Sequence, residues 1–268
     1  MQARPIIDRS VGYSVREIVT PKDQLVYWSL DEVETQKAAI EQAAQAKITY
    51  LPIKSNGKIV GIARREGQDI IEQHSLMAEW LIAADTPILH LIALFAQNAD
   101  RVFLVLQSSE IIGLVAPSDL NKIPARASIY LLTAQFEDLL ANLIREKLEH
   151  EESNLQALLS PENFRKISDE RSRANEEDVS LNLFHYLYFA DLHTIAAKHS
   201  DCREHLGFKS RKQAQQAFDF MAELRNRVSH LTGLLITSRT DLASIDRACE
   251  TMIHLCAKIT SPEQQNNS

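Results

Sequence analysis

Residues 48–63, ITYLPIKSNGKIVGIA, decide the fold of the first half of the chain, because residues 100–115, DRVFLVLQSSEIIGLV, repeat their pattern. The two stretches overlay without a gap at a shift of 52 residues. Several pairs match at this shift: Gly61 with Gly113, Ile53 with Val105, Ile59 with Ile111 and, further upstream, Trp28 with Trp80. Self-similarity at a fixed spacing predicts a duplicated supersecondary unit.

Each copy is expected to contain one helix followed by a two-stranded hairpin. The helices are predicted over residues 32–46 and 87–98, the second with an apolar stripe made by Ile88, Leu91, Ile92 and Phe95. Asp85-Thr86-Pro87 is a helix start signal, with an N-cap candidate before a proline. Ser55-Asn56-Gly57 predicts a tight turn between strands. One such unit is too small to bury its sheet alone, so the copies are expected to pack face to face.

On these residues the first part of the chain resembles a tandem CBS-domain pair, also called a Bateman module. The resemblance covers residues 10–122, with repeats at about 10–70 and 71–122, and rests on LPIKSNGKIVGIA in the first copy and on residues 86–120 in the second. It implies two βαββα repeats. It also implies an adenine nucleotide or a related ligand bound between them.

The resemblance assigns ligand contacts to a Thr or Ser and an Asp that follow the strand glycine. Gly113-Leu-Val-Ala-Pro-Ser-Asp119 keeps Ser118 and Asp119 but has Ala116 where Thr is usual. The first copy departs further, with Arg64 at the Thr position and Gly67 at the Asp position.

The chemistry of these side chains suits a nucleotide. The carboxylate of Asp119 can accept two hydroxyl hydrogen bonds from a ribose. Arg64 and Arg65 can hold phosphates through their guanidinium groups. The alternative is a purely structural or dimerising pair, in which Asp119 caps the helix after Pro117-Ser118 and the arginines are solvated.

The second half of the chain is expected to be all helical. Apolar residues at helical spacing and start signals such as Ser160-Pro161 and Ser210 to Gln213 predict a bundle of four or five helices over residues 126–260. The predicted helices cover about residues 125–150, 161–175, 181–197, 211–231 and 240 onward. The fold class is therefore α+β: a duplicated βαββα pair followed by a helical bundle.

One polar face of the helix at 211–231 carries side chains suited to phosphodiester chemistry. Asn226 and His230 are i, i+4 neighbours that point away from the apolar stripe, and Arg225 flanks them. A neutral His230 can take a proton from a ribose 2′-hydroxyl and return it to the leaving oxygen. Arg225 can stabilise the charge of the transition state, and Asn226 can orient a hydroxyl or the imidazole.

Here the chain resembles the HEPN superfamily, whose signature is an Arg and a His separated by four to six residues. Arg225-Asn-Arg-Val-Ser-His230 matches with four between, and Leu187-Tyr-Phe-Ala-Asp191 matches a segment upstream of this helix in CBS-containing relatives, although Ser229 replaces the usual Ala. The resemblance implies a homodimer and, in many members, a metal-independent endoribonuclease. Other members only bind RNA or protein partners.

Charge agrees with a small RNA-binding patch in an otherwise acidic chain. The formal net charge is -7, which argues against a nucleic-acid coat over the whole surface. Residues 198–230 nevertheless hold seven Lys and Arg against four acids. Residues assigned to the RNA backbone are Lys209, Arg211, Lys212 and Arg227. The alternative is that these are ordinary solvated charges.

Several other classes are excluded by absent motifs. No two glycines are spaced as G-x-G, which excludes Walker and Rossmann phosphate loops. Three cysteines without a CxxC pair, and His185, His193 and His199 at spacings of 8 and 6, predict no metal site. With no signal peptide or spanning segment, a cytoplasmic location is expected.

Expected partners are a second copy, RNA and an adenine nucleotide, without DNA, membrane or a required cofactor. The alternative to a nuclease is a sensor or adaptor whose bundle only dimerises or docks a partner.

Overall fold

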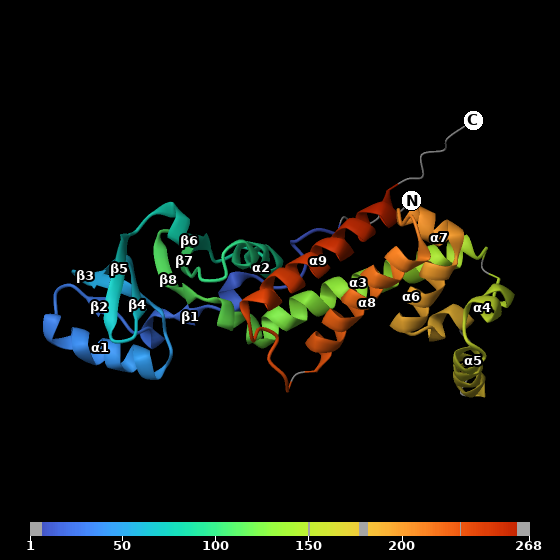
Figure 1. Cartoon of the computed structure of the whole chain (residues 1–268), viewed down its shortest axis with the longest axis horizontal. Helices are drawn as coiled ribbons and strands as arrows, with labels where there is room; N and C mark the ends of the chain where they lie inside the picture. The colour runs from blue at the N-terminus through green and yellow to red at the C-terminus, as the bar shows by residue number, and fades with distance from the viewer. Residues whose placement is uncertain (1–6, 150, 177–181, 231, 262–268) are drawn as a thin grey trace. The chain divides into compact units, whose positions relative to one another are not determined.

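The computed structural model of the chain describes residues 7–149, 151–176, 182–230 and 232–261, and both hairpins of the repeat are present in it (Figure 1). The chain divides into two units. The α/β unit comprises residues 13–125 and 236–242, and the helical unit comprises residues 1–12, 126–235 and 243–268. The chain is therefore α+β, as predicted. The predicted division did not include the return of residues 236–242 to the α/β unit.

Two four-stranded sheets form the α/β unit. The strand orders are β2-β3-β4-β5 and β1-β8-β7-β6. The strands are β1 Thr20–Pro21, β2 Trp28–Ser29, β3 Tyr50–Ser55, β4 Lys58–Glu66, β5 Asp69–Ser75, β6 Leu81–Ala83, β7 Phe103–Gln107 and β8 Glu110–Val115. Ile62 of the first sheet packs with Val102, Leu104 and Leu114 of the second copy in one buried cluster, so the two copies share a core as expected.

The hairpins repeat at the predicted shift of 52 residues. Ile53 lies opposite Gly61 in the first hairpin, and Val105 lies opposite Gly113 in the second, and in each hairpin the register shifts at this point by one extra residue on the second strand. The first turn has positive φ at both Asn56 (48°) and Gly57 (73°), as a tight two-residue reversal requires.

The tryptophan match is wrong, because the shift changes upstream of the hairpins. Trp28 of β2 pairs with Ile53, whereas Ile82 of β6 pairs with Val105, so the equivalent residues there lie 54 residues apart. Trp80 instead ends a short 3-10 helix before β6. The segment between the parallel strand and the hairpin is two residues shorter in the second copy, and the gap-free overlay hid this difference.

Each sheet takes one outer strand from the start of the other copy. β1, at the start of the first copy, pairs with β8 of the second, and β5, at the start of the second copy, pairs with β4 of the first. Both pairings bring a carbonyl close to a strand glycine. A Cβ at Gly61 would lie 2.1 Å from the His74 oxygen, and one at Gly113 would lie 2.2 Å from the Thr20 oxygen.

The two helices of the α/β unit, α1 Val33–Gln45 and α2 Ile88–Gln97, lie within the predicted ranges. The predicted stripe of α2 is buried, and it includes Ile88, Leu91, Ile92 and Phe95. The start of α2 differs from the prediction. Pro87 is itself the N-cap and no side chain caps the helix, so neither Asp85 nor Thr86 has the expected role.

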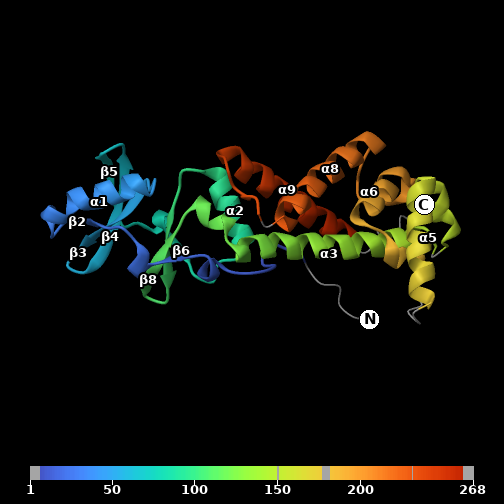
Figure 2. The same cartoon turned by 90° about the horizontal axis from the view of Figure 1, so that it is seen from below.

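The helical unit is built from α3 and the helices after it. Their bounds are α3 Ile123–Lys147, α4 Ser153–Leu158, α5 Pro161–Glu176, α6 Phe189–Lys198, α7 Ser200–His205, α8 Arg211–Ser229 and α9 Arg239–Thr260. Figures 1 and 2 both show α3 and α9 side by side. Among the described residues, none of the helices is both long enough and apolar enough to cross a membrane.

The predicted helix over residues 181–197 is wrong in its first part. Residue 181 lies outside the described residues, a 3-10 turn spans Leu183–Tyr186, and α6 begins only at Phe189. Asp191 causes the new start, because its carboxylate accepts the backbone N–H of Tyr188 at 3.1 Å and so caps the helix. The short helix α4 was also not predicted.

His193 of α6 is a core residue of the helical unit. Its ring lies 3.9 Å from the ring of Phe189 and 4.6 Å from that of Phe218, measured between centroids. Burial lowers the pKa of His193 to about 3. The imidazole is therefore neutral at physiological pH and acts as a packed aromatic ring.

We expect Gly61→Ala and Gly113→Ala each to destabilise the α/β unit by about 2 kcal/mol, because the new methyl group meets a strand carbonyl. Thermal or urea unfolding measures the loss. Gly233→Ala is the control, since a Cβ at that position has nothing within 4 Å. Equal stability of all three variants would contradict the strand exchange.

Candidate functional site

A cavity of about 500 Å³ lies within the α/β unit. Equivalent segments of the two copies line it, since Ala46–Tyr50 leads into β3 and residues 99–102 lead into β7. The remaining lining comes from Thr20 of β1, residues 24–26 before β2, Pro52 of β3, Leu114 of β8 and residues 116–119 after β8. The cavity thus belongs to the repeat as a pair.

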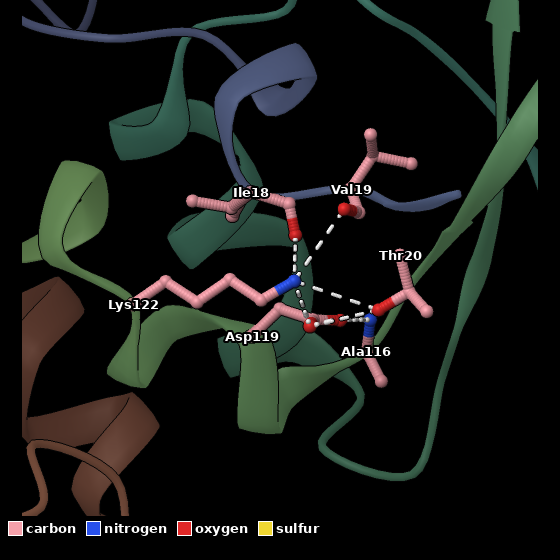
Figure 3. Close-up of polar contacts among 6 residues, drawn as sticks. All are labelled: Ile18, Val19, Thr20, Ala116, Asp119 and Lys122. Atoms are coloured by element: carbon pink, nitrogen blue, oxygen red, sulfur yellow. Dashed lines mark hydrogen bonds and ion pairs between the residues drawn. The ribbon is translucent and has the colours of Figure 1, made fainter. Parts of the chain in front are cut away.

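Asp119 is the most connected polar residue of the cavity wall (Figure 3). It is 8% exposed. Its Oδ1 accepts the hydroxyl of Thr20 at 3.2 Å and the ammonium of Lys122 at 2.8 Å, and its Oδ2 accepts the N–H of Ala116 at 2.7 Å. The last bond caps the 3-10 helix Pro117–Asn121, so the structural role that the sequence left open is present. Asp119 nevertheless also lines the cavity, next to the exposed Ser118.

Arg64 and Arg65, which the sequence assigned to phosphate, are not among the residues that line this cavity. The guanidinium of Arg64 pairs with Glu72 of β5 at 3.1 Å. That of Arg65 donates to the carbonyl oxygens of Ile48, at 2.8 Å, and Gly67. Both side chains are therefore held by neighbouring backbone and strand groups.

Several residues that line the cavity were not predicted from the sequence. Lys47 brings a cationic side chain, and Thr20 and Thr49 bring hydroxyls. Thr20 lies near the start of the first copy, so no local pattern links it to Asp119, 99 residues later. The positive φ of Lys47, 56°, marks the sharp turn between α1 and β3.

The predicted nuclease residues lie at the C-terminal end of α8. His230 is the C-cap residue and is exposed, as is Asn226, whereas Arg225 is half-buried. This agrees with the predicted polar face. Arg225 lies near Glu137 of α3: burial raises the pKa of the Glu137 carboxyl, and the positive charge of Arg225 opposes the rise. Asp191 of the upstream Leu187–Asp191 segment instead accepts the side-chain amide of Asn163 at 2.9 Å.

A buried arginine holds the backbone around His230. Arg126 of α3 is 4% exposed, and its guanidinium donates to the carbonyl oxygens of Arg227 at 3.1 Å, of His230 at 3.2 Å and of Gly233. A cation is favourable there because the last carbonyls of a helix lack partners and carry partial negative charge. Arg126 thus fixes the end of α8, although no sequence motif pointed to it.

Of the four residues assigned to RNA, three lie at the N-terminal end of α8 and Arg227 lies near its C-terminal end. Lys209, Arg211 and Lys212 are exposed at its N-terminal end. Lys212 and His230 are 18 residues apart, which is about 27 Å along a helix. These three side chains therefore lie far from His230 within one chain. Arg227 is at the right end, but its guanidinium donates to the Leu235 carbonyl at 2.5 Å.

Neither candidate site is built from metal ligands. Within the described ranges, no three His, Cys, Asp or Glu side chains gather in a way that could hold a metal ion. Comparisons with known proteins add no assignment. No protein-family model matches the chain, and a search of curated proteins found no match. What the two sites do must therefore be argued from their geometry.

We expect Arg126→Met to destabilise the helical unit by about 2 kcal/mol, because three carbonyls lose a charged donor. Hydrogen exchange of amides at the end of α8 should rise in the same variant. Arg211→Met removes an exposed charge from the other end of α8 and should change stability by less than about 0.5 kcal/mol. If both variants unfold alike, Arg126 does not anchor this end.

Proposed function

We propose that this protein is a nucleotide-responsive regulator, in which residues 10–122 form a tandem CBS pair that binds an adenine nucleotide. The observation that carries the proposal is the cavity of about 500 Å³ lined by equivalent segments of both copies. Its volume is within the range of small-molecule sites.

The lining suits a nucleoside. Apolar side chains able to pack against a base include Leu25, Val26, Ile48, Pro52, Val102 and Leu114. Asp119 and the hydroxyls of Thr20, Thr49 and Ser118 offer hydrogen bonds to a ribose. Lys47 is the cation placed to meet a phosphate, in place of Arg64 and Arg65.

AMP, ATP or S-adenosylmethionine should raise the melting temperature of the wild type, because a ligand that binds only the folded state stabilises it. At a hundred times Kd the expected rise is about 5 °C. Asp119→Asn should lose most of the rise. Asp69→Asn, at an exposed position of β5, should keep it. A screen in which no adenine nucleotide shifts the melting temperature would exclude this function.

As the effector, we propose a HEPN-type, metal-independent endoribonuclease site carried by Arg225, Asn226 and His230 across a homodimer. The exposure of His230 and Asn226 at the end of α8 supports access for an RNA strand. His230 would exchange the proton of the 2′-hydroxyl and the leaving oxygen, and Arg225 would stabilise the transition-state charge. Glu137 beside Arg225 would orient the guanidinium.

An apolar stretch of α3 supports pairing with a second copy. Tyr130 and Leu131 are 49% and 41% exposed, which is unusual for large apolar side chains on a core helix. Tyr130 is seven residues before Glu137 and so lies on the same side of α3. Two copies that join along this side would bring both Arg225 side chains towards one another.

His230→Ala should abolish cleavage of single-stranded RNA while the dimer persists in size-exclusion chromatography. EDTA should leave the wild-type rate unchanged, since the mechanism uses no metal. The matched control is His254→Ala, which removes an exposed histidine of α9. Cleavage that survives in His230→Ala at the wild-type rate would exclude His230 as the catalytic residue.

The alternative is a ligand-sensing adaptor without catalysis, whose bundle dimerises or docks a partner. The placement of Arg227 favours it, because the guanidinium is bonded to the Leu235 carbonyl. The departures at Ala116 and Gly67 also favour it. A wild type that binds a nucleotide but never cleaves RNA would select this function. A cytoplasmic location belongs to either version, because all three cysteines are free and buried.

A further inference from the structure

The carboxylate of Asp119 has little capacity left for a ligand. A carboxylate offers about four acceptor positions, two on each oxygen. Thr20 and Lys122 fill both positions on Oδ1, and the N–H of Ala116 fills one on Oδ2. One position remains, on Oδ2. Asp119 can therefore accept one further hydroxyl as it stands, whereas the two hydroxyls of a ribose are best held with one on each oxygen.

Among the three groups bonded to Asp119, Lys122 carries a positive charge. Its ammonium is 2.8 Å from Oδ1 of Asp119 and 2.7 Å from the carbonyl oxygen of Ile18 (Figure 3). The third donor is shared by the Val19 carbonyl at 3.4 Å and the Thr20 hydroxyl at 3.5 Å. An ammonium has three N–H groups, so all of them are used. Lys122 thus ties the chain before β1 to the cavity wall.

Of the two groups on Oδ1, Lys122 is the one that can leave. Thr20 is fixed because its backbone pairs with Leu114 in the sheet. The Lys122 side chain is 41% exposed and sits on a flexible stem, so its ammonium can move into water. The net free energy of a partly exposed ion pair is small, since solvent replaces the partner.

We propose that Lys122 is an internal competitor for the ligand of this cavity: a molecule with a vicinal diol binds Asp119 by displacing the Lys122 ammonium. The proposal rests on the proposed nucleotide binding and adds its regulation. Binding frees Lys122 from the carbonyl of Ile18 at the position directly before α3. The neighbouring Asn121 exchanges two hydrogen bonds with the backbone of Ile236, at 2.9 and 3.2 Å. The release of Lys122 therefore occurs one residue from the contact that joins residues 236–242 to the α/β unit.

Calorimetric titration with adenosine and 2′-deoxyadenosine tests the competition, because only adenosine has the vicinal diol. Lys122→Met should bind adenosine about fivefold more tightly than the wild type does. It should bind 2′-deoxyadenosine with the same affinity as the wild type. Asp119→Asn should bind adenosine weakly. Lys122→Gln repeats the test with a polar side chain should the Met variant unfold.

Acetylation of Lys122 in the wild type, followed by mass spectrometry, gives a second measurement. Adenosine should speed the acetylation of Lys122, because it frees the ammonium, and 2′-deoxyadenosine should not. Asp119→Asn should speed it without any ligand. Lys58, exposed at the start of β4, is the internal control.

The outcomes separate the two proposals. Wild type that binds adenosine, with Lys122→Met equal or weaker, overturns the competition and leaves nucleotide binding intact. If Lys122→Met binds adenosine tightly and the wild type does not, the competition is supported, because Lys122 then blocks the site in the wild type. If neither protein binds either nucleoside, the proposed ligand and the role of Lys122 towards it both fail.

Discussion

The close approach of a carbonyl to each strand glycine is the constraint on which the α/β unit depends. Gly61 admits the oxygen of His74, and Gly113 admits that of Thr20. These contacts let each sheet take one outer strand from the start of the other copy, so neither sheet is complete within one copy. The exchange also explains the site, because the strand that reaches Gly113 carries the Thr20 hydroxyl to Asp119.

The hairpins could be predicted from the sequence and the outer strands could not, for a physical reason. Strand and turn signals act over a few residues, so the register of Ile53 with Gly61 follows from alternation and from Asn56-Gly57. The strand β1 is two residues long and pairs across more than 90 positions, which leaves no periodicity to detect. The false match of Trp28 with Trp80 has the same cause, since a constant shift was assumed through a helix whose length differs between copies.

The sequence predicted several residues of the candidate sites, but not the groups that surround them. Asp119 lines a cavity, but it bonds to Thr20 and Lys122, and no sequence motif links these two residues to Asp119. Arg64 was assigned to phosphate because β5, which carries its partner Glu72, was not foreseen. By contrast, the distance between Lys212 and His230 could be predicted from the sequence alone, because the rise of a helix per residue is fixed.

The chain from Asp119 to Arg126 contributes to both candidate sites, each within its own unit. Lys122 binds the Ile18 carbonyl beside the cavity, and Arg126, four residues later, binds carbonyls at the end of α8. Arg126 is buried, so an apolar residue there would leave carbonyls at the end of α8 unpaired, whereas water can replace the partly exposed Lys122 at the Ile18 carbonyl. Conservative changes to these two residues therefore separate ligand binding from the geometry at His230 more cleanly than changes to the ligand-facing or exposed residues themselves.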